Sequence, residues 1–255
     1  MDREAGKFKQ LTLGVLAHVL LLLAWYLFVT LGDVPRFVMP SPIDTFRSLA
    51  VADYGWWSNT AVTATEIFGG YAIALTVGVL LALLFTWSKT LESLMLPLLV
   101  TLNMIPKVAL GPLFIVWFKY GVFPNTMMAF SIAVFPILLT TARGLREIEP
   151  DLLDLVRSLR GSRWQLFTKI QLPGALPYVF AGMKVAAILA VAGAIVGEFL
   201  GSDRGLGYLM LQVQVTLDTP AMFMAVILIT MLGMGLYGIV LLLERLLVAK
   251  DARVS

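Results

Sequence analysis

The sequence predicts an all-α, polytopic membrane protein that crosses the bilayer six times. Of its 255 residues, 59% are hydrophobic and only 14% are charged, whereas soluble domains are near half apolar and a quarter charged. Six apolar stretches reach the length of roughly 20 residues that a transmembrane helix needs. They run from Leu11 to Leu31, Thr60 to Trp87, Leu94 to Phe118, Val122 to Ala142, Leu172 to Gly197 and Pro220 to Leu243.

The basic residues predict the orientation of these stretches. If the amino terminus is cytoplasmic, 13 of the 19 Lys and Arg lie inside, six of them between Arg143 and Lys169. The outer connections then hold only Arg36, Arg47, Lys119 and Arg204. Cytoplasmic loops carry an excess of Lys and Arg, so we expect both termini inside and a cytoplasmic loop at about 143–173. The first stretch has no small-residue cleavage site after it, which favours a retained anchor over a signal peptide.

Composition and missing motifs disfavour several kinds of site. The chain has no Cys and a single histidine, His18, which excludes a thiolate site and a cluster of several histidines as a metal site. It has no basic run typical of nucleic-acid binding, no phosphate-binding G-x-x-x-x-G-K-[ST] loop, and no G-x-S-x-G or H-E-x-x-H motif. We therefore expect one domain over residues 1–255, with no catalysis, cofactor or metal of its own.

The expected cytoplasmic loop begins with a short amphipathic helix. Pro150 suits the first position of a helix. Leu152, Leu155, Val156 and Leu159 then follow the spacing of one apolar stripe. On periodicity alone, such a helix could simply lie in the lipid interface.

A second short helix follows in the same loop. Gly161 is expected to end the first helix, and Ser162 with Gln165 forms a capping box that starts the next one. We expect Pro173 and Pro177 to close the segment before the next span.

The loop resembles the coupling loop of ATP-binding-cassette importer permeases, whose signature runs from Glu-Ala-Ala through a Gly to Ile-x-Leu-Pro. Ile170, Leu172 and Pro173 match its end, and the tripeptide 154–156 stands where Glu-Ala-Ala would be. Counting back places Arg160 at the Gly of the signature, so the turn is shifted by one residue if Gly161 makes it. The residues that the resemblance assigns to ATPase coupling are Asp154, Leu155, Val156, Arg157, Ser158, Leu159, Arg160 and Gly161.

Further stretches are similar to the nitrate, sulfonate and taurine branch of these permeases. They are Met39–Pro42, Ile105–Leu110, Pro112–Phe114, Ser162–Trp164, Gly197–Phe199 and Gly205–Leu209. The resemblance implies a type I importer permease in the bacterial inner membrane, paired with a second copy of itself. It also implies two ATPase subunits that bind ATP and Mg²⁺, and an extracytoplasmic substrate-binding protein.

Lys107 and Asn103 lie in the middle of the third stretch, which Pro106 and Pro112 interrupt. Ionisable residues inside membranes are usually functional, and transporters often build substrate sites at broken helices. We therefore expect Asn103 and Lys107, together with Glu198, in the translocation pathway. Alternatively, Lys107 snorkels to the interface or answers a buried carbonyl group.

The positions of the other polar residues in the stretches are compatible with function or with a structural role. Lys184 could snorkel toward the inner interface. Glu66 and Glu198 fall near outer ends, where a carboxylate reaches water, and the lone His18 is expected to be structural.

These observations predict half of a pathway for a small solute, an organic or inorganic anion, driven by ATP hydrolysis in a partner. The alternative is a secondary transporter driven by an ion gradient. Such a carrier would explain the broken helices, but it has no need of the loop and usually shows more spans or a repeat.

Overall fold

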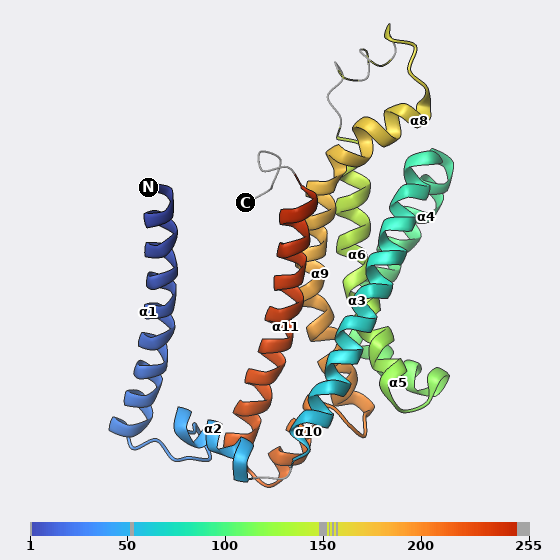
Figure 1. Cartoon of the computed structure of the whole chain (residues 1–255). Helices are drawn as coiled ribbons and strands as arrows, with labels where there is room; N and C mark the ends of the chain where they lie inside the picture. The colour runs from blue at the N-terminus through green and yellow to red at the C-terminus, as the bar shows by residue number, and fades with distance from the viewer. Residues whose placement is uncertain are drawn as a thin grey trace. The chain divides into compact units, whose positions relative to one another are not determined.

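The computed structural model describes residues 2–51, 54–147, 152, 154, 156 and 158–248, which form helices and connections without a strand (Figure 1). The helices are α1 (Asp2–Leu31), α2 (Pro42–Val51), α3 (Trp56–Trp87), α4 (Lys89–Met104), α5 (Lys107–Phe118), α6 (Val122–Gly144), α8 (Arg163–Leu166), the π-helical turn η1 (Phe167–Gln171), α9 (Leu172–Gly201), α10 (Leu206–Val215) and α11 (Thr219–Leu247). The chain forms two compact units, residues 1–56 with 209–228 and residues 57–208 with 229–255. We call them the first and second units.

In the first unit, hydrogen bonds and one aromatic pair tie distant segments together. The Trp25 indole donates to the carbonyl of Pro40 at 3.0 Å and packs 5.7 Å from the ring of Phe223. Tyr54 donates to Asp218 at 2.6 Å, a bond that raises the pKa of Tyr54 to about 12. The phenol therefore stays protonated at physiological pH, and the contact keeps its donor.

In the second unit, close contacts show the directions of the packed helices. Gly182, Gly193 and Gly197 of α9 pack against residues 137, 129 and 125 of α6, so these two helices run antiparallel, side by side in Figure 1. Gly70 and Gly78 of α3 pack against residues 129 and 137 of α6, so α3 and α6 run parallel. Small residues at such contacts let membrane helices approach closely.

The parallel course of α3 and α6 decides how the chain passes through α4 and α5. This pair is bent by 96° at the break between Met104 and Lys107. The chain leaves α3 at one end of the unit and must enter α6 at the other end, so α4 and α5 together cross from end to end. With the five long apolar helices, the broken span completes the six crossings predicted from the sequence.

The break itself follows from proline geometry. Pro106 disfavours helical dihedrals at the residue before it, and Ile105 is extended, with φ −64° and ψ 124°. The interruption predicted within Leu94–Phe118 is therefore confirmed, as a sharp bend between two helices.

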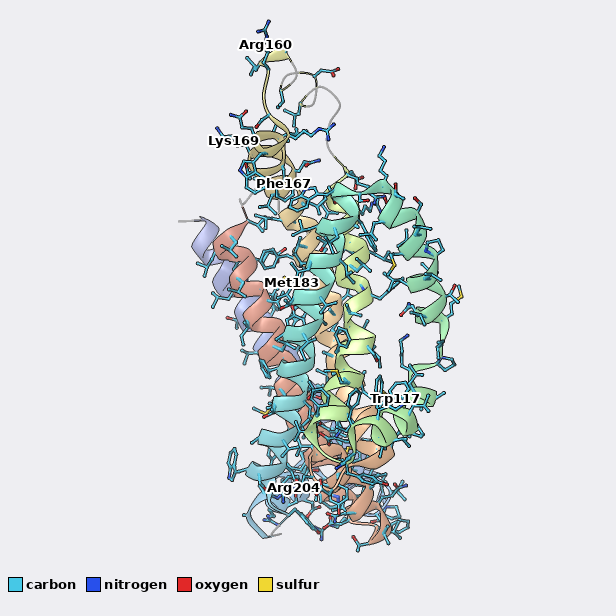
Figure 2. The ribbon with its side chains drawn as sticks, turned by 90° about the vertical axis from the view of Figure 1, so that its right-hand side faces the viewer. Trp117, Arg160, Phe167, Lys169, Met183 and Arg204 are labelled. Carbon is cyan, nitrogen blue, oxygen red and sulfur yellow. The ribbon has the colours of Figure 1, made fainter. Side chains whose placement is uncertain are left out.

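Figure 2 shows Arg160, Phe167 and Lys169 toward one end of the second unit, Trp117 and Arg204 toward the other, and Met183 between them. We call these the loop end and the far end. Most of the basic residues described in this unit lie at the loop end, as the sequence predicts for the cytoplasmic side.

Candidate coupling loop and translocation pathway

The turn between the two loop helices is made by Arg160. Its φ is +51°, in the left-handed region, and the N–H of Gly161 donates to the carbonyl of Val156 at 2.8 Å. This is the arrangement in which a left-handed residue after the helix end lets the next N–H satisfy an open carbonyl. The turn is therefore not shifted to Gly161, because Arg160 adopts the conformation that glycine favours at that position.

The described part of the loop confirms some predicted features and leaves others open. Residues 152, 154, 156 and 158 are helical. Pro150, Leu155 and Arg157 lie outside the described residues.

The second loop helix continues into the next span. The Ser162 hydroxyl accepts from the N–H of Gln165 at 3.1 Å, and the Gln165 side chain accepts from the N–H of Ser162 at 2.8 Å, which confirms the predicted capping box. The helix then runs on as one 39-residue apolar element, Arg163–Gly201. The expectation that Pro173 and Pro177 close it is wrong, because α9 contains both residues and the helix continues through them.

One face of this second loop helix is anchored, and another is open. Phe167 is buried, and its ring lies 5.6 Å from Trp87 at the end of α3 and 5.8 Å from Trp164. By contrast, Trp164 is 64% exposed, and Leu159 beside the turn is 73% exposed. The loop thus leaves apolar side chains exposed, while Phe167 holds it to the helices.

At the broken span, the side chain of Lys107 donates a hydrogen bond to a backbone carbonyl. Its Nζ donates to the carbonyl of Leu102 at 2.9 Å, across the break. The carbonyl groups of the last turn of a helix lack partners within the helix, and a Lys side chain commonly satisfies them. Asn103 is exposed beside it. Because the helix bends here, counting residues along a straight span does not give the depth of Lys107.

Glu198 and Glu66 do not reach water in this chain, contrary to the expectation from their positions. Their exposures are 1% and 0%. Glu198 accepts the hydroxyl of Thr63 at 2.6 Å and the N–H of Tyr208 at 3.2 Å. The structure therefore encloses Glu198 among the packed helices, and its place in the translocation pathway stays a prediction.

Two ion pairs link segments of the second unit that are far apart in the sequence. Lys184 on α9 donates to Glu244 on α11 at 3.1 Å, and it therefore does not snorkel. Arg146 pairs with Glu92 on α4. This second pair lines a cleft of about 750 Å³ between α3, α4, the turn after α6 and the end of η1.

A family model supplies the decisive comparison. The model described as "Binding-protein-dependent transport system inner membrane component" matches residues 74–249, which include the loop, the bend and Glu198. The chain belongs to this family. It is an importer permease for a small solute and not a carrier driven by an ion gradient.

Individual relatives agree with this permease family. The "Riboflavin transport system permease protein RibX" of Chloroflexus aurantiacus is 34% identical, over 98% of this chain and 94% of its own. The "Putative aliphatic sulfonates transport permease protein SsuC" of Bacillus subtilis is 27% identical, over 91% and 85%. This second relative confirms the branch predicted from the sequence.

A solved structure gives the fold. The chain is similar to a chain in "Inward facing conformations of the MetNI methionine ABC transporter: CY5 SeMet soak crystal form", with a TM-score of 0.53 and 22% identity over 73% of this chain and 93% of that one. The predicted permease architecture is thereby confirmed.

Sequence reasoning missed several residues that organise the permease. Phe167, Thr63, Asn125 and Glu244 received no role from the sequence. The available signals were a polar Thr63 and Glu66 at helical spacing inside an apolar stretch, and an acidic residue close to the glycine-rich segment 205–207.

Proposed function

We propose that this permease forms one half of a translocation pathway, paired with a second identical copy. Two ATPase subunits and an extracytoplasmic binding protein complete the importer. The uncovered broken span supports the pairing, because within this chain α4 has no buried residue and α5 buries only Gly111. An apolar helix with so little cover is available to another subunit.

We infer that the loop end faces the cytoplasm of a bacterial inner membrane. Figure 2 shows Arg160 and Lys169 at the loop end, whereas Arg204 lies at the far end. The positive-inside rule favours this orientation, with both termini in the cytoplasm.

The observation that carries the coupling proposal is the continuous helix from Arg163 to Gly201. A subunit that moves the exposed Leu159 and Trp164 moves the start of this helix. Because Phe167 packs on the end of α3, the same movement reaches two spans at once. Rigid elements that have two arrangements transmit such changes between distant sites. The coupling contact would be made by residues 154–161 with Trp164, and ATP with Mg²⁺ would be bound by the partner.

The solute is proposed to be a small organic or inorganic anion that passes Asn103 and Lys107. An ammonium at the break between α4 and α5 provides positive charge where the span lies uncovered. Relatives carry the names of riboflavin and aliphatic sulfonate systems. A sulfonate is an anion, which agrees with this charge, whereas riboflavin would use the hydrogen-bonding capacity of Asn103.

The coupling proposal is tested by Leu159→Asp. A carboxylate in an apolar contact is costly unless it is paired, so we expect the ATPase to be lost when the permease is purified from membranes. Leu247→Asp is the matched control, since Leu247 is 60% exposed and ends α11 outside the loop. Retention of the ATPase by the Leu159 variant, with ATP hydrolysis still stimulated by substrate, would show that the docking surface lies elsewhere.

A further inference from the structure

A buried polar cluster at the far end of the second unit surrounds the two glutamates. Glu198 Oε1 accepts the hydroxyl of Thr63, and its Oε2 accepts the N–H groups of Gly207 and Tyr208. Those N–H groups belong to the first turn of α10, where backbone donors have no partner within the helix. Glu198 therefore acts as the acceptor for the start of α10.

Side chains of α3 also accept backbone N–H groups at the start of α10, and together with Glu198 they form what we call the α10 anchor. The Thr63 hydroxyl accepts from the N–H of Leu206 at 2.8 Å, and Asn59 accepts from the N–H of Gly205 at 2.9 Å. Gly205 has a φ of +108°, and a Cβ there would collide with the carboxyl group of Glu198. The sequence Gly205-Leu206-Gly207 is thus fitted to a carboxylate supplied by α9.

Glu66 contacts this carboxylate and has an oxygen without a donor. Its Oε1 accepts the side-chain amide of Asn125 at 2.8 Å, and its side chain lies in hydrogen-bonding contact with Glu198. Its buried Oε2 has no hydrogen-bond donor among the described residues. Two ionised carboxylates in a buried contact repel each other, whereas one proton between them makes a hydrogen bond.

We propose that Glu66 and Glu198 hold one proton between them, with Glu66 carrying it on Oε2 and donating it to Glu198. The charge then lies on Glu198, which receives three further hydrogen bonds and fixes the first turn of α10. The groups that contact the pair from α3, α6 and α10 are the Thr63 hydroxyl, the Asn125 amide and the two N–H groups, all neutral. Because none of these groups is positively charged, the proton is what neutralises the charge of the second carboxylate.

The experiment combines infrared spectroscopy with limited proteolysis of the purified transporter complex at neutral pH. A protonated carboxyl group has a C=O stretching band apart from the amide bands. We expect this band in the wild type and its loss in Glu66→Gln. Glu244→Gln is the matched control, because Glu244 is also buried but is paired with Lys184, so its replacement should leave the band unchanged.

Trypsin then reports on the anchor at the exposed Arg204, directly before α10. Gln at position 66 supplies the same donor and acceptor, so Glu66→Gln should assemble and resist cleavage at Arg204 like the wild type. Gln at position 198 keeps one acceptor oxygen for three donors, so cleavage there should be roughly tenfold faster, equal to about 1.4 kcal/mol. A wild type without the band, a band lost only in Glu198→Gln, or a Glu66→Gln variant that fails to assemble would each overturn the proposal.

Discussion

At the scale of the residue, Arg160 shows that a backbone conformation favoured by glycine can be kept when another residue type occupies the position. The left-handed region costs a residue with a Cβ roughly 1–2 kcal/mol, and Arg160 occupies it. The family signature has glycine at this position, which fits the conformation without strain. The chain therefore keeps the turn of the family and accepts some strain in it.

Arg160→Gly should relieve that strain. We expect the loop to gain about 1 kcal/mol of stability, because glycine enters the left-handed region freely. Hydrogen exchange at the amide of Gly161, which donates across the turn, measures the change. Arg163→Gly is the control, since Arg163 is helical and glycine should weaken the helix there by up to about 1 kcal/mol. Faster exchange in the Arg160 variant would contradict the assignment.

Lys107 has two candidate roles, and one substitution separates them. Lys107→Met removes the charge and the bond to the Leu102 carbonyl while keeping similar length. We expect transport of an anionic solute to slow by roughly tenfold, the equivalent of about 1.4 kcal/mol. ATP hydrolysis stimulated by the loaded binding protein should persist.

Lys107→Arg keeps both the charge and the donor and should transport normally. Unchanged transport by the Met variant over a range of solute concentrations would reduce Lys107 to a structural cap of α4.

At the scale of the element, the continuous helix from Arg163 to Gly201 links the loop to the spans through Phe167. Local signals predicted part of this arrangement. The Ser162–Gln165 capping box depends on residues three positions apart, and it was predictable from the sequence. Pro106 allowed us to predict that the third span is interrupted. The size of the bend, 96°, was not predictable, because it depends on how α5 packs before α6 begins.

Phe167→Ala should uncouple ATP hydrolysis from transport. Removing a buried aromatic side chain typically costs about 3–5 kcal/mol, and here it would free the loop helix from Trp87 at the end of α3. We expect the complex to assemble and hydrolyse ATP with little transport, measured as solute moved per ATP hydrolysed in liposomes. Trp164→Ala is the exposed neighbour for comparison and should instead weaken ATPase binding. An unaltered ratio in the Phe167 variant would remove this route of coupling.

The buried contacts between helices were beyond sequence reasoning. Glu66 and Glu198 meet although 132 positions separate them, and Lys184 meets Glu244 across 60 positions. Such pairings require knowledge of which helices run side by side and in which register. Composition and periodicity predicted each helix singly, so these carboxyl groups were placed by their distance from span ends alone.

At the scale of the whole molecule, the six crossings and the family membership make the chain one component of a larger machine. The composition, the charge distribution and the loop were sufficient to predict this. The number of subunits follows from a different consideration. In the proposed importer, a single loop would engage one docking groove, whereas an ATPase pair would offer two.

We therefore expect the native complex to contain two copies of this chain and two ATPase subunits. Native mass spectrometry of the complex, extracted from its own membranes, measures the stoichiometry. Mixing two differently tagged copies of the permease provides the control, because both tags should be recovered together. A complex with a single permease, or with two different permeases, would be inconsistent with the proposed pairing.

The bare surface of α4 and α5 also governs how the protein should be handled. Leu94, Leu98 and Val116 are exposed within the chain, and lipid tails or a neighbouring subunit cover such side chains in the membrane. Short-chain detergents compete for that surface and would dissociate the copies. Preparation in lipid nanodiscs, with the partner subunits expressed alongside, keeps the surface covered during purification.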